Sequence, residues 1–186
     1  MSGRLPGRSG WGRPFVPSEK IFIGLGSNLG DCRSNLQTAL RLLEQKTGTG
    51  LTLSSFYRSE PVGVLDQPWF WNMAASFPAR ACGLLSRPHE ILAVLKEIER
   101  EMGRVPTIRF GPRLIDLDLL FYKDWVLETC HLTVPHPRLT ERSFVLLPLM
   151  ELDPLLCHPG RQQTVSQLYQ SNQHLFSHCE KTAGFF

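Results

Sequence analysis

The order of strand-type and helix-type patterns constrains the fold of this chain more than any other feature of the sequence. Apolar residues recur at helical spacing in two segments, at Leu36, Ala39, Leu40 and Leu43 and again at Ile91, Leu92, Leu95 and Ile98. Strand-type runs lie at 20–26, 51–59, 69–77 and 114–122. The resulting order β-α-β-β-α-β predicts an α+β, ferredoxin-like core, with an antiparallel sheet and helices on one face.

A C-terminal extension is expected after this core. It begins with the proline-rich loop "VPHPR" at 134–138. A helix near 140–151 and a short helix near 164–170 should follow.

The net charge of +3 is concentrated at the N-terminus. Three of the 20 basic residues are Arg4, Arg8 and Arg13, and without them 17 basic residues face 17 acidic ones. The neutral remainder argues against a nucleic-acid-binding protein. We expect this Gly/Pro-rich stretch to be disordered. A transit peptide is the alternative, although the Gly and Pro content disfavours an amphipathic helix.

No apolar run reaches the length of a membrane span, and the N-terminus lacks the apolar segment of a signal peptide. The five cysteines are scattered, without a metal-binding spacing. These features predict reduced thiols in a cytoplasmic protein that binds neither membrane nor nucleic acid.

Two aspartates interrupt the apolar run "GPRLIDLDLLFY" at 111–122. Residues i and i+2 of a strand point to the same face, so Asp116 and Asp118 should project together. Carboxylates about 7 Å apart along a strand can share divalent cations such as Mg²⁺. The alternative is a solvent-facing strand that carries two acids without a function.

Arginines precede this pair in the segment "GRVPTIRFGPR" at 103–113, which contains Arg104, Arg109 and Arg113 but no acid. Such a segment beside two carboxylates suits a metal-bound polyphosphate. A structural ion network between these arginines and the aspartates is the alternative.

Two further groups of residues are candidates. His136 lies between two prolines, ahead of Arg142, and is either a phosphate ligand or incidental. Phe70 and Asn72 share a strand face and suit a flat heterocycle, by stacking and by edge hydrogen bonds. The alternative for this pair is a core phenylalanine beside a hydrogen-bonded amide.

Taken together, four motifs closely resemble the 6-hydroxymethyl-7,8-dihydropterin pyrophosphokinase family of folate biosynthesis. They are "GLGSNLGD", "FYRSEPVG" with "DQPWFWN", "GPRLIDLDLLFY" and "VPHPRLTERSFVLLPLMEL", in the family's order over about 20–170. The resemblance implies transfer of pyrophosphate from MgATP to the pterin hydroxymethyl group, which releases AMP. We therefore expect a tail at 1–19, a pyrophosphokinase domain at 20–170 and a second tail at 171–186.

The resemblance also implies roles for individual residues. Two Mg²⁺ ions would be held by Asp116 and Asp118, and Arg104 and Arg113 would be catalytic. The pterin would be bound by Ser59, Val62, Phe70, Asn72 and Phe144. ATP, the co-substrate, would be bound by Glu99, Arg113, Leu119, Leu132, Thr133, His136 and Arg142.

The chain departs from the family pattern at three positions. Pro106 and His131 stand where arginine is expected, and Phe110 stands where tryptophan is frequent. We nevertheless expect the segment 103–113 to close over the triphosphate. A monomer with a functional link to other folate-pathway enzymes is expected. The competing functions are an RNA-binding ferredoxin-like module and a metal-dependent phosphohydrolase.

Overall fold

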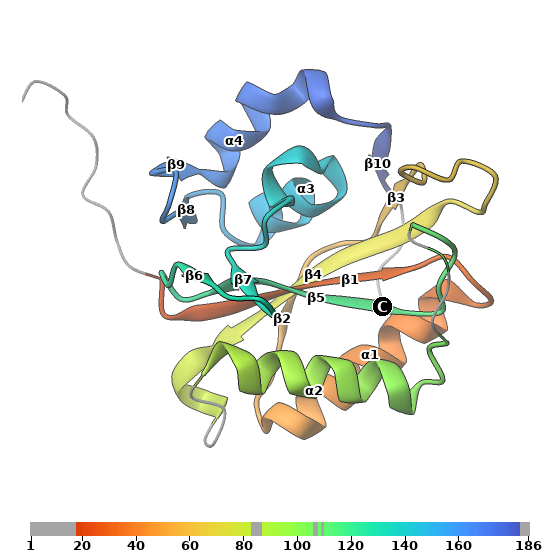
Figure 1. Cartoon of the computed structure of the whole chain (residues 1–186), viewed down its shortest axis with the longest axis horizontal. Helices are drawn as coiled ribbons and strands as arrows, with labels where there is room; N and C mark the ends of the chain where they lie inside the picture. The colour runs from red at the N-terminus through yellow and green to blue at the C-terminus, as the bar shows by residue number, and fades with distance from the viewer. Residues whose placement is uncertain (1–17, 83–86, 106–107, 109, 183–186) are drawn as a thin grey trace, which may run out of the picture.

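The computed structural model describes residues 18–82, 87–105, 108 and 110–182. Within these residues, a six-stranded antiparallel sheet has the strand order β10-β3-β4-β1-β5, and β2 pairs separately with β4 (Figure 1). Its strands are β1 (Lys20–Ser27), β2 (Thr52–Leu53), β3 (Tyr57–Ser59), β4 (Phe70–Pro78), β5 (Asp116–Tyr122) and β10 (Cys179–Lys181). Two short ribbons lie outside it: β6 (Leu127–Glu128) with β7 (Thr133–Val134), and β8 (Cys157–His158) with β9 (Gln163–Thr164).

Helices cover both faces of this sheet (Figure 1). The helices α1 (Cys32–Thr47) and α2 (Pro88–Glu101) pack on one face, as the sequence predicts. The C-terminal extension places α3 (Ser143–Leu152) and α4 (Val165–Asn172) on the other face. The expectation of helices on one face is confirmed for the β-α-β-β-α-β core, and the C-terminal extension adds its own helices on the other face.

Three short 3₁₀ helices complete the described elements, at Ala79–Cys82, Leu139–Glu141 and Gln173–Leu175. The α+β, ferredoxin-like class predicted from the element order is confirmed.

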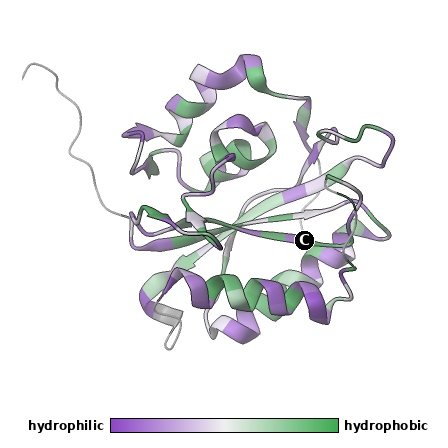
Figure 2. Cartoon of the chain, viewed as in Figure 1, coloured by the Kyte–Doolittle hydropathy of each residue, from purple (hydrophilic) through white to green (hydrophobic). Residues whose placement is uncertain are grey.

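Alternation along β1 divides the apolar side chains between two cores. Ile21, Ile23 and Leu25 join the core beneath α1 and α2. Phe22 joins the core beneath α3 and α4. Figure 2 shows hydrophobic residues along the central strands and a mixture of hydrophobic and hydrophilic residues along α2. A helix with one apolar side is expected where only that side meets a sheet.

The segment 51–59 was predicted as one strand, and this prediction was wrong, because the structure divides the segment into β2 and β3. Ser54 lies between the two. Its hydroxyl oxygen accepts a hydrogen bond of 2.9 Å from the backbone N–H of Ala74. Ser54 also donates that hydroxyl to the carbonyl of Ser55 at 2.8 Å. A side chain thus replaces a backbone partner here, which interrupts the ladder.

Strand β10 lies within the section 171–186 that we expected to be a tail. It pairs with β3 and places Cys179 opposite Ser59. Hydrogen bonds from Glu60 N to His178 O, at 3.2 Å, and from Thr182 N to Phe56 O, at 3.0 Å, continue the pairing. Part of this section therefore belongs to the sheet. The expected N-terminal tail lies, up to residue 17, outside the described residues.

Two expectations from composition can be compared with the described residues. None of the helices in this part of the chain is long and apolar enough to cross a membrane. Cys32, Cys130, Cys157 and Cys179 are free thiols. The side chain of Cys82 lies outside the described residues.

Candidate active site

Two neighbouring cavities meet at β5, a strand at one edge of the sheet. The first, here called the strand cavity, takes most of its walls from strands and from the start of α3. It is lined by Gly24, Leu25, Gly26, Ser59, Glu60, Val62, Phe70, Asn72, Met73, Ala74, Phe110, Arg113, Asp116, Asp118, Leu120, Arg142, Phe144 and Val145. The second, the arginine cavity, is lined by Lys96, Glu99, Arg100, Arg104, Ile108, Phe110, Arg113, Asp116, Asp118, His136, Arg138 and Arg142.

Glycines in β1 create the floor of the strand cavity. Gly24 and Gly26 lie on the same strand face as Phe22, yet they carry no side chain to fill the space. A Cβ at Gly26 would come within 3.3 Å of the Asn72 Oδ1 atom. In the sheet register, Gly26 stands between Asn72 on β4 and Asp116 on β5. Adjacent strands lie about 4.8 Å apart. The Asn72 amide and the Asp116 carboxylate stand on the two strands that flank β1, so they are separated by about two strand spacings, over the open floor at Gly26.

Aromatic rings form the walls above this floor. Phe70 enters from β4, and Phe144 enters from the first turn of α3. The Asn72 side chain is buried, with its Nδ2 atom 3.0 Å from the Ser59 Oγ atom. Two rings and a fixed amide are the groups that a flat heterocycle requires, for stacking and for recognition of its edge.

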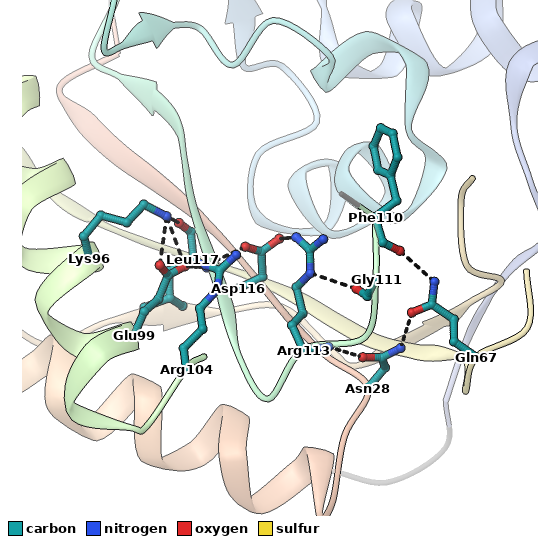
Figure 3. Close-up of polar contacts among 10 residues, drawn as sticks. All are labelled: Asn28, Gln67, Lys96, Glu99, Arg104, Phe110, Gly111, Arg113, Asp116 and Leu117. Carbon is teal, nitrogen blue, oxygen red and sulfur yellow. Dashed lines mark hydrogen bonds and ion pairs between the residues drawn. The ribbon is translucent and has the colours of Figure 1, made fainter. Parts of the chain in front are cut away.

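The two aspartates stand where the cavities meet. Asp116 forms ion pairs through both carboxylate oxygens, with Arg104 at 2.9 Å and with Arg113 at 2.7 Å (Figure 3). Asp118 lies two residues further along β5, on the same strand face. Burial and the nearby charge of Asp116 raise the pKa of the Asp118 carboxyl group. The structural ion network that the sequence left open is therefore present, with Asp116 as the aspartate that takes part in it.

Glu99 anchors the arginine cavity from α2. Its buried carboxylate accepts the backbone N–H of Leu117 at 2.7 Å, the Lys96 ammonium at 2.9 Å, and a hydrogen bond from Arg104 (Figure 3). Leu117 lies between Asp116 and Asp118 in β5. A charge-assisted contact at this backbone N–H fixes the strand at the acid pair. Glu99 thus supports the pair in addition to lining the cavity.

His136 and two arginines complete the arginine cavity. Burial, and then the charges of Arg142 and Arg138, lower the pKa of His136 to about 4. The imidazole is therefore neutral at pH 7, and its Nδ1 atom accepts the backbone N–H of Arg138 at 3.3 Å. Burial, and then Arg138, lower the pKa of Arg142. The positive charges of Arg138 and Arg142 repel each other in the free protein, an arrangement that favours a polyanionic ligand.

Comparisons with known proteins agree with this geometry. The model of the family described as 7,8-dihydro-6-hydroxymethylpterin-pyrophosphokinase (HPPK) matches residues 22–154. The chain belongs to this family. A 2-amino-4-hydroxy-6-hydroxymethyldihydropteridine pyrophosphokinase of Bacillus subtilis is 43% identical over 132 residues, which cover 70% of this chain and 76% of that protein.

Other HPPK relatives are longer. A mitochondrial folate synthesis bifunctional protein of Pisum sativum is 49% identical over 135 residues, which cover 72% of this chain and 25% of that protein. The chain thus spans about a quarter of the length of the first relatives it matches. A crystal structure of Plasmodium falciparum HPPK-DHPS A437G with SDX-DHP matches this chain with a TM-score of 0.66 at 18% identity. The match covers 86% of this chain and 46% of the chain in that crystal structure. At this identity the similarity concerns the fold.

Most of the HPPK residues predicted from the sequence line a cavity. The strand cavity receives Ser59, Val62, Phe70, Asn72 and Phe144, and the arginine cavity receives Glu99, Arg104 and His136, while Arg113, Arg142, Asp116 and Asp118 line both. Their roles toward a ligand stay predictions.

Three residues predicted to bind ATP line neither cavity. Leu119 and Leu132 are buried in the core beneath α1 and α2. Thr133 is partly buried in β7. Any contact of Leu119 or Leu132 with ATP would have to use the backbone. Arg109 and Pro106 lie outside the described residues, so closure of the segment 103–113 stays a prediction.

Several cavity residues were not assigned from the sequence. Gly24 and Gly26 form the floor, and glycines inside an apolar strand are a recognisable indication that a ligand approaches the backbone. Phe110, noted only as a departure from the family pattern, lines both cavities. Arg138 places its guanidinium carbon 5.0 Å from the Phe110 ring centroid. No local pattern indicated that Arg138 or Lys96 would face this cavity.

The donor set suits a hard divalent cation that completes its shell with other ligands. Within the part of the chain that the structure describes, no group of three or more His, Cys, Asp or Glu side chains could hold a metal. Mg²⁺ is typically bound by one or two carboxylates together with water and substrate phosphates. Asp116 and Asp118 fit that pattern.

Proposed function

We propose that this HPPK-family chain transfers pyrophosphate from MgATP to 6-hydroxymethyl-7,8-dihydropterin and releases AMP. One observation carries the proposal: Asp116 and Asp118 line both a cavity with aromatic walls and a cavity with arginine walls. A heterocycle in the first and a triphosphate in the second would bring their reacting ends together at this pair. Membership of the HPPK family supports the same assignment.

The strand cavity would bind the pterin. The rings of Phe70 and Phe144 would stack on the heterocycle, while Asn72 and Ser59 would contact its polar edge. Asn72 is well suited to this role because it is buried and its amide is already oriented by Ser59 at 3.0 Å. Val62, exposed in the loop between β3 and β4, would cover the ligand.

The arginine cavity would bind the triphosphate. Arg113 and Arg142 line both cavities and would contact phosphate oxygens near the point of transfer. Arg104 would leave Asp116 for the phosphates, because a divalent cation held by that carboxylate would repel the guanidinium and replace it as the counter-charge. His136 is neutral in the free protein and could donate through one ring nitrogen.

Asp116 and Asp118 would hold Mg²⁺, and we propose two ions. Bound there, Mg²⁺ would neutralise phosphate charge and polarise the phosphorus under attack. The chain's own contribution is placement: β5 fixes both carboxylates, Glu99 fixes β5, and the strand cavity aims the hydroxymethyl oxygen at them. Phosphoryl-type transfers depend mainly on such positioning and on charge stabilisation.

An AMP-release assay tests the proposal. The protein, ATP and Mg²⁺ should yield AMP only when 6-hydroxymethyl-7,8-dihydropterin is present, and chelation of the metal should stop the reaction. Release of inorganic phosphate without the pterin would favour a phosphohydrolase that uses the same aspartates. No pterin-dependent AMP would refute the transfer.

The cellular setting is a separate proposal. The Pisum sativum relative is named as a bifunctional folate synthesis protein, which supports a link between this chain and other folate enzymes. That relative is also named as mitochondrial, whereas we predict a cytoplasmic, monomeric protein from the sequence. Fractionation and light scattering would test location and oligomeric state.

A further inference from the structure

Glu151, in the last turn of α3, lines neither cavity yet joins this helix to the sheet. Its Oε2 atom accepts the Tyr57 hydroxyl at 2.9 Å, and its Oε1 atom accepts the Ser55 hydroxyl at 2.7 Å. The Lys181 ammonium donates to the same Oε1 atom at 3.2 Å. Tyr57 begins β3 and Lys181 ends β10, the two strands at one edge of the sheet (Figure 1). One carboxylate thus holds the end of α3 against both strands.

Protonation fixes the direction of these hydrogen bonds. Burial by itself would raise the pKa of Glu151, but hydrogen bonds from Ser55 and Tyr57 outweigh it and lower that pKa. Burial, and then Glu151, raise the pKa of Tyr57. At pH 7 the carboxylate is therefore ionised, and the phenol keeps the proton that it donates. Because Tyr57 is buried, its hydroxyl would lose free energy without this partner.

Glu151 lies on the same side of α3 as Phe144, whose ring lines the strand cavity. The two residues are about two helical turns apart, so their side chains project in nearly the same direction. On β3, Tyr57 and Ser59 likewise share a face, because they stand two residues apart. Ser59 lines the strand cavity together with Phe144. The contact between Glu151 and Tyr57 therefore spans the same space between α3 and β3 as the cavity does.

The first turn of α3 depends on contacts outside the helix. Pro148 has no N–H to donate to the Phe144 carbonyl, four residues before it, so one bond of the helix ladder is missing at the cavity. The buried Ser143 hydroxyl donates instead to the Ser177 carbonyl, at 3.1 Å. Ser177 leads into β10, the strand that Lys181 ends. Both ends of α3 are thus held by the segment that pairs with β3.

We infer that Glu151 is a positioning residue for the heterocycle, because it sets the distance between the Phe144 ring and the strands that form the strand cavity. The inference rests on the proposed function, in which Phe144 stacks on the pterin. Stacking requires a gap that matches one flat ring. Without the contacts of Glu151, α3 would move away from β3 and the gap would widen.

The expected loss is specific to the pterin. Arg104, Arg113 and Arg138 of the arginine cavity come from elements other than α3. Nucleotide affinity should therefore depend little on where α3 lies. A stacking contact that is lost equally from the ground state and the transition state raises KM and leaves kcat unchanged.

Three substitutions test this role. Glu151→Ala removes every contact of the carboxylate, and Tyr57→Phe removes only the buried hydroxyl. Glu151→Gln is the conservative variant, because its amide keeps an oxygen that accepts from Ser55 and an N–H that can donate to the Tyr57 oxygen. The matched control is Glu44→Ala in α1. Glu44 also accepts a hydrogen bond from another segment, the Leu51 N–H at 3.2 Å, but lines neither cavity.

Steady-state AMP release would give kcat and the KM values for the pterin and for ATP. Calorimetry would give the pterin affinity with Mg²⁺ and a non-hydrolysable ATP analogue at saturation. Glu151→Ala should raise both KM and Kd for the pterin about tenfold, and Tyr57→Phe about threefold. In both variants, kcat and the KM for ATP should change by less than about twofold. Glu151→Gln and Glu44→Ala should keep every constant within about twofold of the wild type.

Two results would overturn the inference. One is an unchanged KM for the pterin in Tyr57→Phe and in Glu151→Ala, whatever happens to kcat or to the melting temperature, since a merely structural role gives that pattern. The other is an equal loss in Glu151→Gln and Glu151→Ala, because the amide keeps the contacts that position α3. If thermal unfolding shows that Glu151→Ala does not fold, Tyr57→Phe decides. Failure of the proposed function is distinguishable, because the wild type would then bind no pterin and release no AMP.

Discussion

The strand cavity and the arginine cavity meet at the same two aspartates but take their walls from different kinds of structure. The strand cavity is built on β1, β4 and β5, whose register places Asn72, Gly26 and Asp116 side by side. The arginine cavity takes Arg104 and Arg113 from the segment between α2 and β5, and Arg138 from the loop after β7. The first holds its shape through backbone pairing, and the second through ion pairs.

This difference indicates how each half responds to a ligand. In the strand cavity, the buried Asn72 amide already has a partner, so a heterocycle meets a prepared surface. In the arginine cavity, Arg104 and Arg113 neutralise Asp116 and, under the proposed function, would exchange that partner for phosphates. Five variants would sharpen or break this contrast.

The largest effect is expected at the shared acid pair. Asp118→Ala should lower turnover by about 100- to 1,000-fold, because metal and triphosphate lose a fixed ligand. The fold should persist, since the raised pKa of Asp118, caused by burial and by Asp116, shows that its ionised form destabilises the free protein. AMP release and thermal unfolding would measure both effects, with the exposed Asp66→Ala as the control. Near-normal AMP release would refute the assignment.

The next largest effect is expected at Asn72 and Phe144, two of the residues proposed to bind the pterin. Asn72→Ala and Phe144→Ala should each weaken pterin binding by about 10- to 100-fold, through lost edge hydrogen bonds and lost stacking. Affinity for the nucleotide analogue should hardly change in Asn72→Ala. The Arg142 guanidinium carbon lies 5.5 Å from the Phe144 ring centroid, so Phe144→Ala could also disturb the other half. If Asn72→Ala lost affinity for the pterin and for the nucleotide analogue equally, the division of the site into two halves would be contradicted.

Proton uptake at His136 should distinguish nucleotide binding from pterin binding. Its pKa is lowered to about 4, by burial and then by Arg142 and Arg138, so it is neutral at pH 5.5 in the free protein. A bound triphosphate should raise that pKa, and nucleotide binding should take up a fraction of one proton, whereas pterin binding should take up none. Calorimetry in buffers of different ionisation enthalpy would measure this uptake. His136→Gln should abolish it, and uptake that persists would exclude His136.

His136 should also make the stability of the folded protein depend on pH. Because the pKa of His136 is lower in the folded protein, the unfolded chain binds more protons between about pH 4 and pH 6.5. The contribution of His136 to the free energy of unfolding is therefore fully present above about pH 6.5 and is lost as the pH falls towards 4. The loss should reach at most about 3 kcal/mol. Denaturant unfolding at pH 7 and pH 4.5 should show a smaller pH effect in His136→Gln. An unchanged pH effect would contradict the lowered pKa.

The smallest effect is expected at Ser59. Ser59→Ala removes the hydroxyl that accepts from Asn72 at 3.0 Å, which should weaken pterin binding by about fivefold, for a hydrogen bond of about 1 kcal/mol. Nucleotide affinity should stay at the wild-type value. If nucleotide affinity falls as well in titrations of the variant, the strand cavity is less independent than its backbone pairing suggests.

The sequence was sufficient where the determinants are local. The alternation along β5 put Asp116 and Asp118 on one face, and the helical spacing in α1 and α2 put their apolar residues on one side. It was not sufficient for the segment 51–59, because the interruption at Ser54 depends on a hydrogen bond with Ala74 on another strand. Nor did it show that residues 179–181 would pair with β3, since nothing in a short polar stretch specifies an edge strand.

Local periodicity by itself thus determined the ferredoxin-like order, the acid pair and, through the family motifs, most of the candidate site. Tertiary structure alone decided that α3 returns over the second sheet face, and that this packing brings Phe144 and Arg142 to β4 and β5. It also decided that the arginines neutralise Asp116 and that Glu151 meets Tyr57. The physical reason is that packing, rather than local backbone preference, sets the geometry of these contacts, even where the partners are as close in sequence as Arg113 and Asp116.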